Sequence, residues 1–155
     1  MIVVDTSALL GAWYMHYLPD SMPGFWTWFD EAWEDGRLVI SSVVYDELTE
    51  QSEAARVWVH ERRSRVVVPS EEVQGVVGDL MDRFRFAEGR DGADPFVIAE
   101  ARVRSFGVAT YEGKSPTGST AKPKKNVDNI PTICRALDVQ CWPPGEAWRE
   151  AGLSL

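Results

Sequence analysis

The sequence contains few cysteine and histidine residues. Its 155 residues include two cysteines, Cys134 and Cys141, and two histidines, His16 and His60. Two cysteines cannot build a disulfide framework or a four-ligand zinc site, although they allow one bridge. We therefore expect a reduced, cytoplasmic protein. Nucleases that work without a metal ion usually need a histidine acid and base, and the two histidines lie far apart in the sequence with no supporting motif around them.

Long apolar runs and nucleotide-binding motifs are also lacking. No apolar run approaches the roughly 20 residues of a membrane span. The first residues, MIVVDTSALL, contain no basic residue and place Asp5 inside the apolar stretch, which argues against a signal peptide. No Gly-x-Ser-x-Gly, P-loop or Gly-x-Gly-x-x-Gly motif supports an acyl hydrolase or a nucleotide-binding protein. The composition, 45% hydrophobic and 26% charged, is that of one globular domain over residues 1–155.

The acidic charge is concentrated at the start of the chain. The formal net charge of the protein is −8, and residues 1–50 contain nine acids and one base, Arg37. Residues 101–135 contain seven bases and two acids, a local charge of +5. The net charge of the whole chain therefore does not argue against a nucleic-acid partner.

Alternating strand and helix patterns predict an α/β domain. We predict strands at residues 2–4, 38–40, 108–111 and 139–142, with 66–68 as a short strand or an extended link. We predict helices directly after residues 5–7 and at residues 23–35, 42–50, 53–64, 71–86, 94–105, 131–137 and 145–151. Strands that alternate with helices favour a parallel sheet of four or five strands, covered by helices on both faces. Such sheets bind ligands beyond the carboxyl ends of their strands.

Aromatic residues are abundant in the predicted helix at 23–35. Phe25, Trp28, Phe29 and Trp33 recur at helical spacing, which predicts a face buried in the core. Trp26 lies off that face, which predicts an exposed side chain that belongs to a partner surface.

Four acids follow or flank the predicted strands and helix starts. Asp5 ends the first strand, Glu47 lies on the helix after the second, Asp94 is the predicted N-cap of the helix that Pro95 begins, and Glu112 follows the strand at 108–111. Each acid alone fits an ordinary role as a turn, cap or surface residue. Clustered carboxylates repel one another, and a divalent cation relieves that repulsion. Oxygen ligands suit Mg²⁺ or Mn²⁺.

These segments, in this order, resemble the PIN-domain nucleases over essentially the whole chain. The resemblance rests on IVVDTSALL, on Glu47-Leu48, on ADPFVIAEA and on the strand that ends in Thr110-Tyr111-Glu112. Together with NIPTICRALDV and a short closing helix, they are most similar to an uncharacterised PIN-like subfamily. The resemblance implies a three-layer α/β/α fold with a parallel sheet.

The resemblance also implies a function. PIN-like toxins of toxin–antitoxin pairs cut RNA with Mg²⁺ or Mn²⁺ and leave a 5′-phosphate and a 3′-hydroxyl. The implied catalytic and metal-binding acids are Asp5, Glu47, Asp94 and Glu112. A hydroxyl of Thr6 or Ser7 orients Asp5 or a water molecule, unless it only caps the helix. The implied partners are an RNA substrate and an antitoxin protein encoded nearby, and a homodimer stays open.

One departure from the subfamily and two alternative functions remain. The subfamily often has an acid where this chain has Thr132, so Asp128 competes with Glu112 for the role of fourth acid. One alternative function is a catalytically silent PIN-like module that binds RNA or protein. The other is a structure-selective DNA nuclease, which would normally carry more acids and a larger DNA-binding surface.

A basic segment directly follows Glu112. Residues 113–126 contain Lys114, Lys122, Lys124 and Lys125 and no acid. Their Gly, Pro and Ser content predicts a loop. We expect these lysines to contact the RNA backbone, with a merely solvated loop as the competing interpretation.

Overall fold

A parallel sheet lies at the centre of the computed structural model, which describes residues 1–86, 92–113 and 127–154. Its four strands within these residues are β1 (Ile2–Val4), β2 (Leu38–Val39), β3 (Gly107–Ala109) and β4 (Cys141–Trp142). They pair in the order β2-β1-β3-β4, and every pairing is parallel. All residues of β1 and β3 are buried, as expected where helices cover both faces. The predicted parallel sheet is confirmed.

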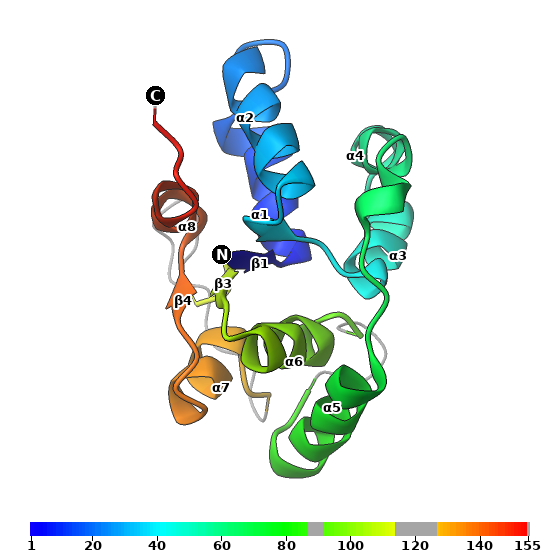
Figure 1. The fold of residues 1–155 in the computed structure, drawn as a ribbon, viewed down its shortest axis with the longest axis vertical. Helices are drawn as coiled ribbons and strands as arrows, with labels where there is room; N and C mark the ends of the chain where they lie inside the picture. Colours follow the sequence, from blue (N-terminus) through cyan, green and yellow to red (C-terminus); the bar gives the residue numbers. More distant parts are fainter. Residues whose placement is uncertain (87–91, 114–126, 155) are drawn as a thin grey trace.

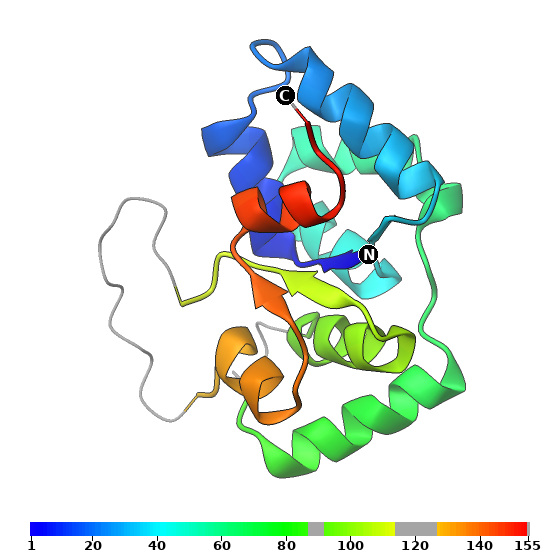
Figure 2. The same cartoon turned by 60° about the vertical axis from the view of Figure 1, so that its left-hand side comes forward.

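Helices form a layer on each side of this sheet (Figure 1). Their bounds are α1 (Thr6–Gly11), the π-helical segment η1 (Ala12–His16), α2 (Pro23–Glu34), α3 (Ser42–Gln51), α4 (Glu53–His60), the 3-10 turn η2 (Arg63–Arg65), α5 (Glu71–Arg83), α6 (Asp94–Arg104), α7 (Ile130–Ala136) and α8 (Pro144–Glu150). The layer with α2 and α8 covers one face, and α6 covers the other with α5 packed outside it. Figure 2 shows β1, β3 and β4 between these two layers. The predicted three-layer α/β/α fold is confirmed.

An aromatic cluster fills the core between α2, α4 and α8. Phe29 is fully buried on α2, and its ring centroid lies 5.6 Å from that of Trp148 on α8 and 5.8 Å from that of Trp58 on α4. Burying an aromatic side chain of this size stabilises the fold by about 1.5–3 kcal/mol. The predicted apolar face of residues 23–35 is therefore the contact that joins three helices.

The expectation that Trp26 is exposed is wrong. Only 7% of its surface is accessible, and its indole Nε1 donates a hydrogen bond to the carbonyl oxygen of Tyr17. Its ring packs edge-on against Trp58, at a centroid distance of 5.0 Å. The spacing within α2 defined one buried face, but α4 covers a second face of the same helix.

Several boundaries differ from the sequence predictions. Helix α5 ends at Arg83, three residues before the predicted end at 86. Residues 66–68 are an extended link, in which Val67 makes one isolated bridge to Ser41. Asp94 is the first residue of α6 and Ala93 is the N-cap, so the prediction of Asp94 as N-cap is wrong by one position. Frayed helix ends make shifts of this size common.

None of the described helices is long and apolar enough to cross a membrane.

Candidate active site

The first predicted acid lies between the two central strands, at their carboxyl ends. Asp5 directly follows β1, and its backbone N–H donates to the carbonyl oxygen of Ala109 at the end of β3, at 3.0 Å. The chain passes from β1 to β2 on one side and later places β3 on the other side. The strand order therefore reverses between β1 and β3, which is where open parallel sheets bind their ligands.

Two hydroxyl groups hold the carboxylate of Asp5. Ser7 Oγ and Thr110 Oγ1 both donate to Asp5 Oδ2, at 2.5 and 2.8 Å. Ser7 Oγ accepts the N–H of Tyr111 at 3.0 Å, and Thr110 Oγ1 accepts the N–H of Glu112 at 3.1 Å. This network fixes the orientation of the carboxylate and joins the start of α1 to the segment after β3.

Burial perturbs the ionisation of Asp5. The residue is 3% exposed, and this desolvation raises its pKa above the ordinary value of 3.8, while the hydrogen bonds from Ser7 and Thr110 partly oppose the rise. Among the described residues, no Lys, Arg or His forms an ion pair with it. A charged carboxylate in this position is therefore under-compensated, and a bound cation would stabilise it.

Glu47 lies on the neighbouring helix α3 and is joined to the residue after Asp5. Thr6 Oγ1 donates to Glu47 Oε2 at 2.8 Å, and Gln51 Nε2 donates to Glu47 Oε1 at 3.3 Å. Ser41 caps the start of α3 by accepting the N–H of Val43, which fixes the direction in which the helix leaves β2. Of the two predicted supporting hydroxyls, Ser7 therefore contacts Asp5 and Thr6 contacts Glu47.

Asp94 approaches the same edge of the sheet from the opposite layer. It is half-buried at the first position of α6, which packs against β1 and β3. Because α6 leads directly into β3, it runs antiparallel to that strand. Its first residue therefore lies toward the carboxyl ends of the strands.

Glu112 connects the site to α7. Its Oε2 accepts the N–H of Ile130, the first residue of α7, at 2.8 Å, and so satisfies one of the unpaired donors at that helix start. The competing acid, Asp128, accepts the N–H of Arg85 on its Oδ2 at 2.8 Å. Thr132 is exposed, and its N–H donates to Asn129 Oδ1. Glu112, through Thr110, is thus the acid of the two that the hydrogen-bond network joins to Asp5.

The chemistry of the four acids suits a metal ion, but their positions in this structure do not bring three of them together. The four acids supply only oxygen ligands, which suit Mg²⁺ or Mn²⁺. Within the described residues, however, no three His, Cys, Asp or Glu side chains converge closely enough to hold one ion. The structure joins Asp5 to Ser7 and Thr110, and Glu47 to Thr6. The acids could hold one ion together only if their carboxylates came closer to one another than they are in this structure.

Sequence reasoning missed the role of Thr110 in this site. Its side chain is 3% exposed and donates directly to Asp5. The available signal was a hydroxyl residue at the end of a strand predicted to lie in the same sheet as the first. The predicted RNA-contacting lysines Lys114, Lys122, Lys124 and Lys125 lie outside the described residues.

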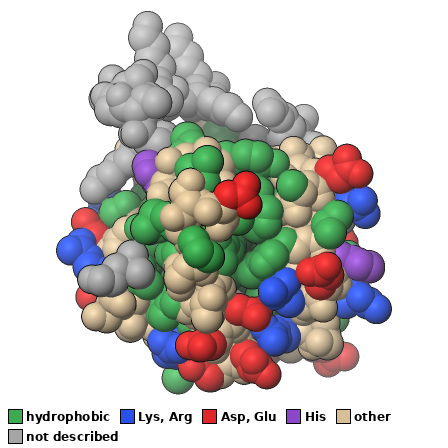
Figure 3. Space-filling model, turned by 90° about the horizontal axis from the view of Figure 1, so that it is seen from above, with side chains coloured by type: hydrophobic (Ala, Val, Ile, Leu, Met, Phe, Trp, Pro, Cys, Tyr) green, Lys and Arg blue, Asp and Glu red, His purple; other side chains and the backbone are tan. Residues whose placement is uncertain are grey.

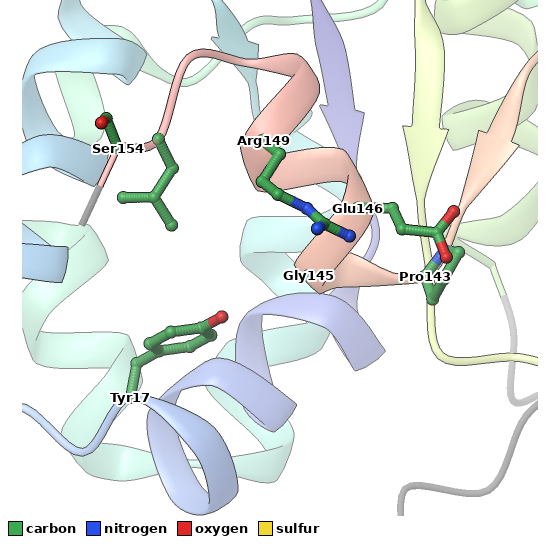
Figure 4. Close-up of a pocket in the computed structure, with 7 residues that line it drawn as sticks. Tyr17, Pro143, Gly145, Glu146, Arg149 and Ser154 are labelled. Carbon is green, nitrogen blue, oxygen red and sulfur yellow. The ribbon is translucent and has the colours of Figure 1, made fainter.

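Two pockets lie near β4 and α8. The smaller, about 320 Å³, adjoins the candidate site, and Thr110, Glu112, Arg135 and Cys141 contribute to its wall. The larger, about 670 Å³, contains none of the predicted site residues (Figure 4). Its lining residues are Tyr17, Pro143, Gly145, Glu146, Arg149, Leu153 and Ser154. Of these two pockets, the smaller is therefore the one that a predicted site acid, Glu112, lines.

The parallel sheet between two helix layers is the PIN-like fold that the sequence predicts. The structure is similar to FitAcB from Neisseria gonorrhoeae, with a TM-score of 0.52 and 19% sequence identity over 94% of this chain and 99% of that chain. The protein belongs to the family described as Domain of unknown function (DUF4411), which matches residues 2–155. No curated protein matches the sequence significantly. The resemblance to a PIN-like subfamily is thereby confirmed.

Proposed function

We propose that this protein is a metal-dependent endoribonuclease and the toxin of a type II toxin–antitoxin pair. The observation that carries the proposal is the buried carboxylate of Asp5 at the reversal of strand order, held by two hydroxyls and paired with no described cation. A fold maintains such an unfavourable charge where the site uses it. The PIN-like fold supports this class of activity by analogy with the PIN-domain nucleases that the sequence resembles.

The proposed cofactor is Mg²⁺ or Mn²⁺, with Asp5, Glu47, Asp94 and Glu112 as the residues that would hold it. When bound, the ion supplies charge neutralisation at the phosphoryl group and acidifies water, and the reaction leaves a 5′-phosphate and a 3′-hydroxyl.

The remaining steps belong to side chains of this chain. Ser7 and Thr110 orient the Asp5 carboxylate, because both hydroxyls donate to the same oxygen, Oδ2. Thr6, the residue directly after Asp5, positions Glu47 by donating a hydrogen bond to its carboxylate. Glu112 lines the adjoining pocket of about 320 Å³, to which Arg135 adds a positive charge suited to a phosphate of the RNA backbone.

The proposed antitoxin partner has an apolar surface available to it. Tyr14, Met15 and Leu18, on and just after η1, and Val57 on α4 are each about half exposed. The two elements are adjacent, because the Tyr14 hydroxyl hydrogen-bonds with the hydroxyl of Ser52 at the start of α4. Figure 3 shows hydrophobic side chains gathered at the middle of one face, with charged side chains around them. The excess of acids in residues 1–50 favours a basic partner segment.

Cleavage of RNA by single-acid variants tests the proposal. Asp5→Asn, Glu47→Gln and Asp94→Asn should each reduce cleavage in Mg²⁺ by at least about 100-fold, since even the loss of an outer partner of a metal ligand commonly costs 10–100-fold. Asp79→Asn, an exposed acid on α5, is the matched control and should cleave like the wild type. Each variant should keep the circular dichroism spectrum of the parent.

Two results would contradict the proposal. Full cleavage by Asp5→Asn in Mg²⁺ would remove the nuclease assignment. RNA binding by the wild type without any cleavage, over a range of Mg²⁺ and Mn²⁺ concentrations, would favour the catalytically silent binding module instead. The absence of a three-acid cluster among the described residues is the observation that keeps this second candidate in view.

A further inference from the structure

The two cysteines of the chain face each other between α7 and β4. Cys134 is buried on α7, Cys141 is the half-buried first residue of β4, and both are free thiols. The interaction between the two side chains is the main influence on the ionisation of both: it raises the pKa of Cys134 and lowers the pKa of Cys141. Two thiols in direct contact can be joined with small movements, whereas distant ones cannot.

The backbone between the two cysteines keeps them together. Asp138 adopts a left-handed conformation with φ 56°, and the N–H of Val139 donates to the carbonyl oxygen of Cys134 at 2.9 Å. This tight turn reverses the chain directly into β4, where Cys141 pairs with Val108 of β3. The contact between the thiols is thus built into the connection from α7 to β4.

The two thiols differ in access. Cys141 contributes to the wall of the pocket of about 320 Å³ beside Glu112, whereas Cys134 is completely buried. A small oxidant in that pocket reaches Cys141 first, and Cys134 lies behind it. This arrangement is that of an attacking and a resolving cysteine.

We propose that Cys134 and Cys141 form a reversible intramolecular disulfide that responds to peroxide and ties α7 to β4 at the edge of the candidate active site. Disulfides in cytoplasmic proteins are usually transient and redox-sensing. The bond would connect the helix whose first N–H is held by Glu112 to the strand beside that acid. Its formation therefore acts on the position of Glu112 as well as on stability.

The chemistry balances with hydrogen peroxide as the oxidant. The Cys141 sulfur attacks one peroxide oxygen, the O–O bond breaks, and Cys141 becomes a sulfenic acid with release of one water molecule. The Cys134 sulfur then attacks the Cys141 sulfur, the S–OH bond breaks and a second water molecule leaves. Two thiols are oxidised by two electrons in total, and one peroxide is reduced to two waters. A dithiol reductant reverses the bond by thiol–disulfide exchange.

Mass spectrometry of the intact, folded protein tests the proposal without any measurement of RNA cleavage. After stoichiometric hydrogen peroxide, the wild-type chain should lose about 2 Da and both free thiols, and dithiothreitol should restore them. Peptide mapping should find the cross-link between residues 134 and 141. The melting midpoint of the oxidised form should rise by about 5 °C, because the bond closes a short loop in the unfolded chain.

Two matched variants assign the roles. In Cys134→Ser, peroxide should leave a sulfenic acid on Cys141 that a dimedone probe captures. In Cys141→Ser, the buried Cys134 should stay unmodified under the same conditions. The proposal is overturned if both wild-type thiols survive, if Cys141 proceeds to a sulfinic acid without a cross-link, or if the disulfide joins two chains. Because the wild-type mass alone decides the question, a variant that fails to fold does not obscure it.

Discussion

Replacing Gly11 by alanine tests the close contact between α1 and the segment that follows β3. Gly11 lies in right-handed helical backbone, so alanine meets no conformational barrier there. A Cβ atom at this position would lie 2.1 Å from Tyr111 Cε2 and 2.5 Å from its Cδ2. The tyrosine ring must retreat by more than 1 Å to reach ordinary contact distance. Tyr111 is also the residue whose N–H donates to Ser7, beside Asp5.

The size of the effect follows from two opposing contributions. Inserting a methyl group into a packed contact costs about 1–3 kcal/mol of unfolding free energy. Replacing glycine by alanine inside a helix gains about 1 kcal/mol. The net expectation for Gly11→Ala is a loss of about 1 kcal/mol. The same substitution at Gly75 on α5, where a Cβ meets nothing within 4 Å, should instead gain about 0.5–1 kcal/mol.

Thermal unfolding of the two variants, followed by circular dichroism, measures the difference. At about 2–4 °C per kcal/mol for a chain of this size, the midpoint of Gly11→Ala should fall about 3–8 °C below that of Gly75→Ala. In a Tyr111→Ala background, Gly11→Ala should no longer carry the steric cost, because the ring that its Cβ atom meets is absent. Equal midpoints for the two glycine variants would refute the packing argument, since helix propensity alone treats both positions alike.

Three further predictions concern the candidate site. Burial raises the folded-state pKa of Asp5, so the unfolding free energy should fall as the pH rises from near 4 through the raised pKa. In metal-free buffer at pH 7, Asp5→Asn should therefore have a higher melting midpoint than the wild type, and a lower midpoint would contradict this. Cleavage should stop in excess EDTA and return with Mg²⁺ or Mn²⁺ but poorly with Ca²⁺, whose longer and looser ligand distances misplace the water. Activity that persists in chelator and requires His16 or His60 would favour metal-free catalysis. Changing Lys122, Lys124 and Lys125 to alanine should weaken RNA binding and flatten its salt dependence by about two units, with the melting midpoint unchanged; an unchanged salt slope would leave the segment as a solvated loop.

Local pattern was enough to predict most of the layers. The β-branched run at 2–4, the Asp94-Pro95 helix start and the aromatic spacing within 23–35 each reflect short-range rules of strands, caps and buried faces. Strand–helix alternation then implied parallel pairing and the edge at which a site lies. The resemblance to PIN-domain nucleases selected four acids that local pattern alone treated as ordinary turn, cap or surface residues.

Tertiary contacts decided which groups meet at that edge. Thr110 donates to Asp5 across 105 residues, and Thr6 donates to Glu47 across 41. No sequence pattern identifies these partners, because such contacts depend on strand register and on helix position. The same reason explains the burial of Trp26 beneath α4 and the facing thiols of Cys134 and Cys141. The sequence by itself determined the elements and their order, since these depend on neighbours along the chain, and its resemblance to PIN-domain nucleases supplied the candidate acids. Only the packed structure decided the hydrogen-bond partners of each acid, because these come from segments that folding brings together.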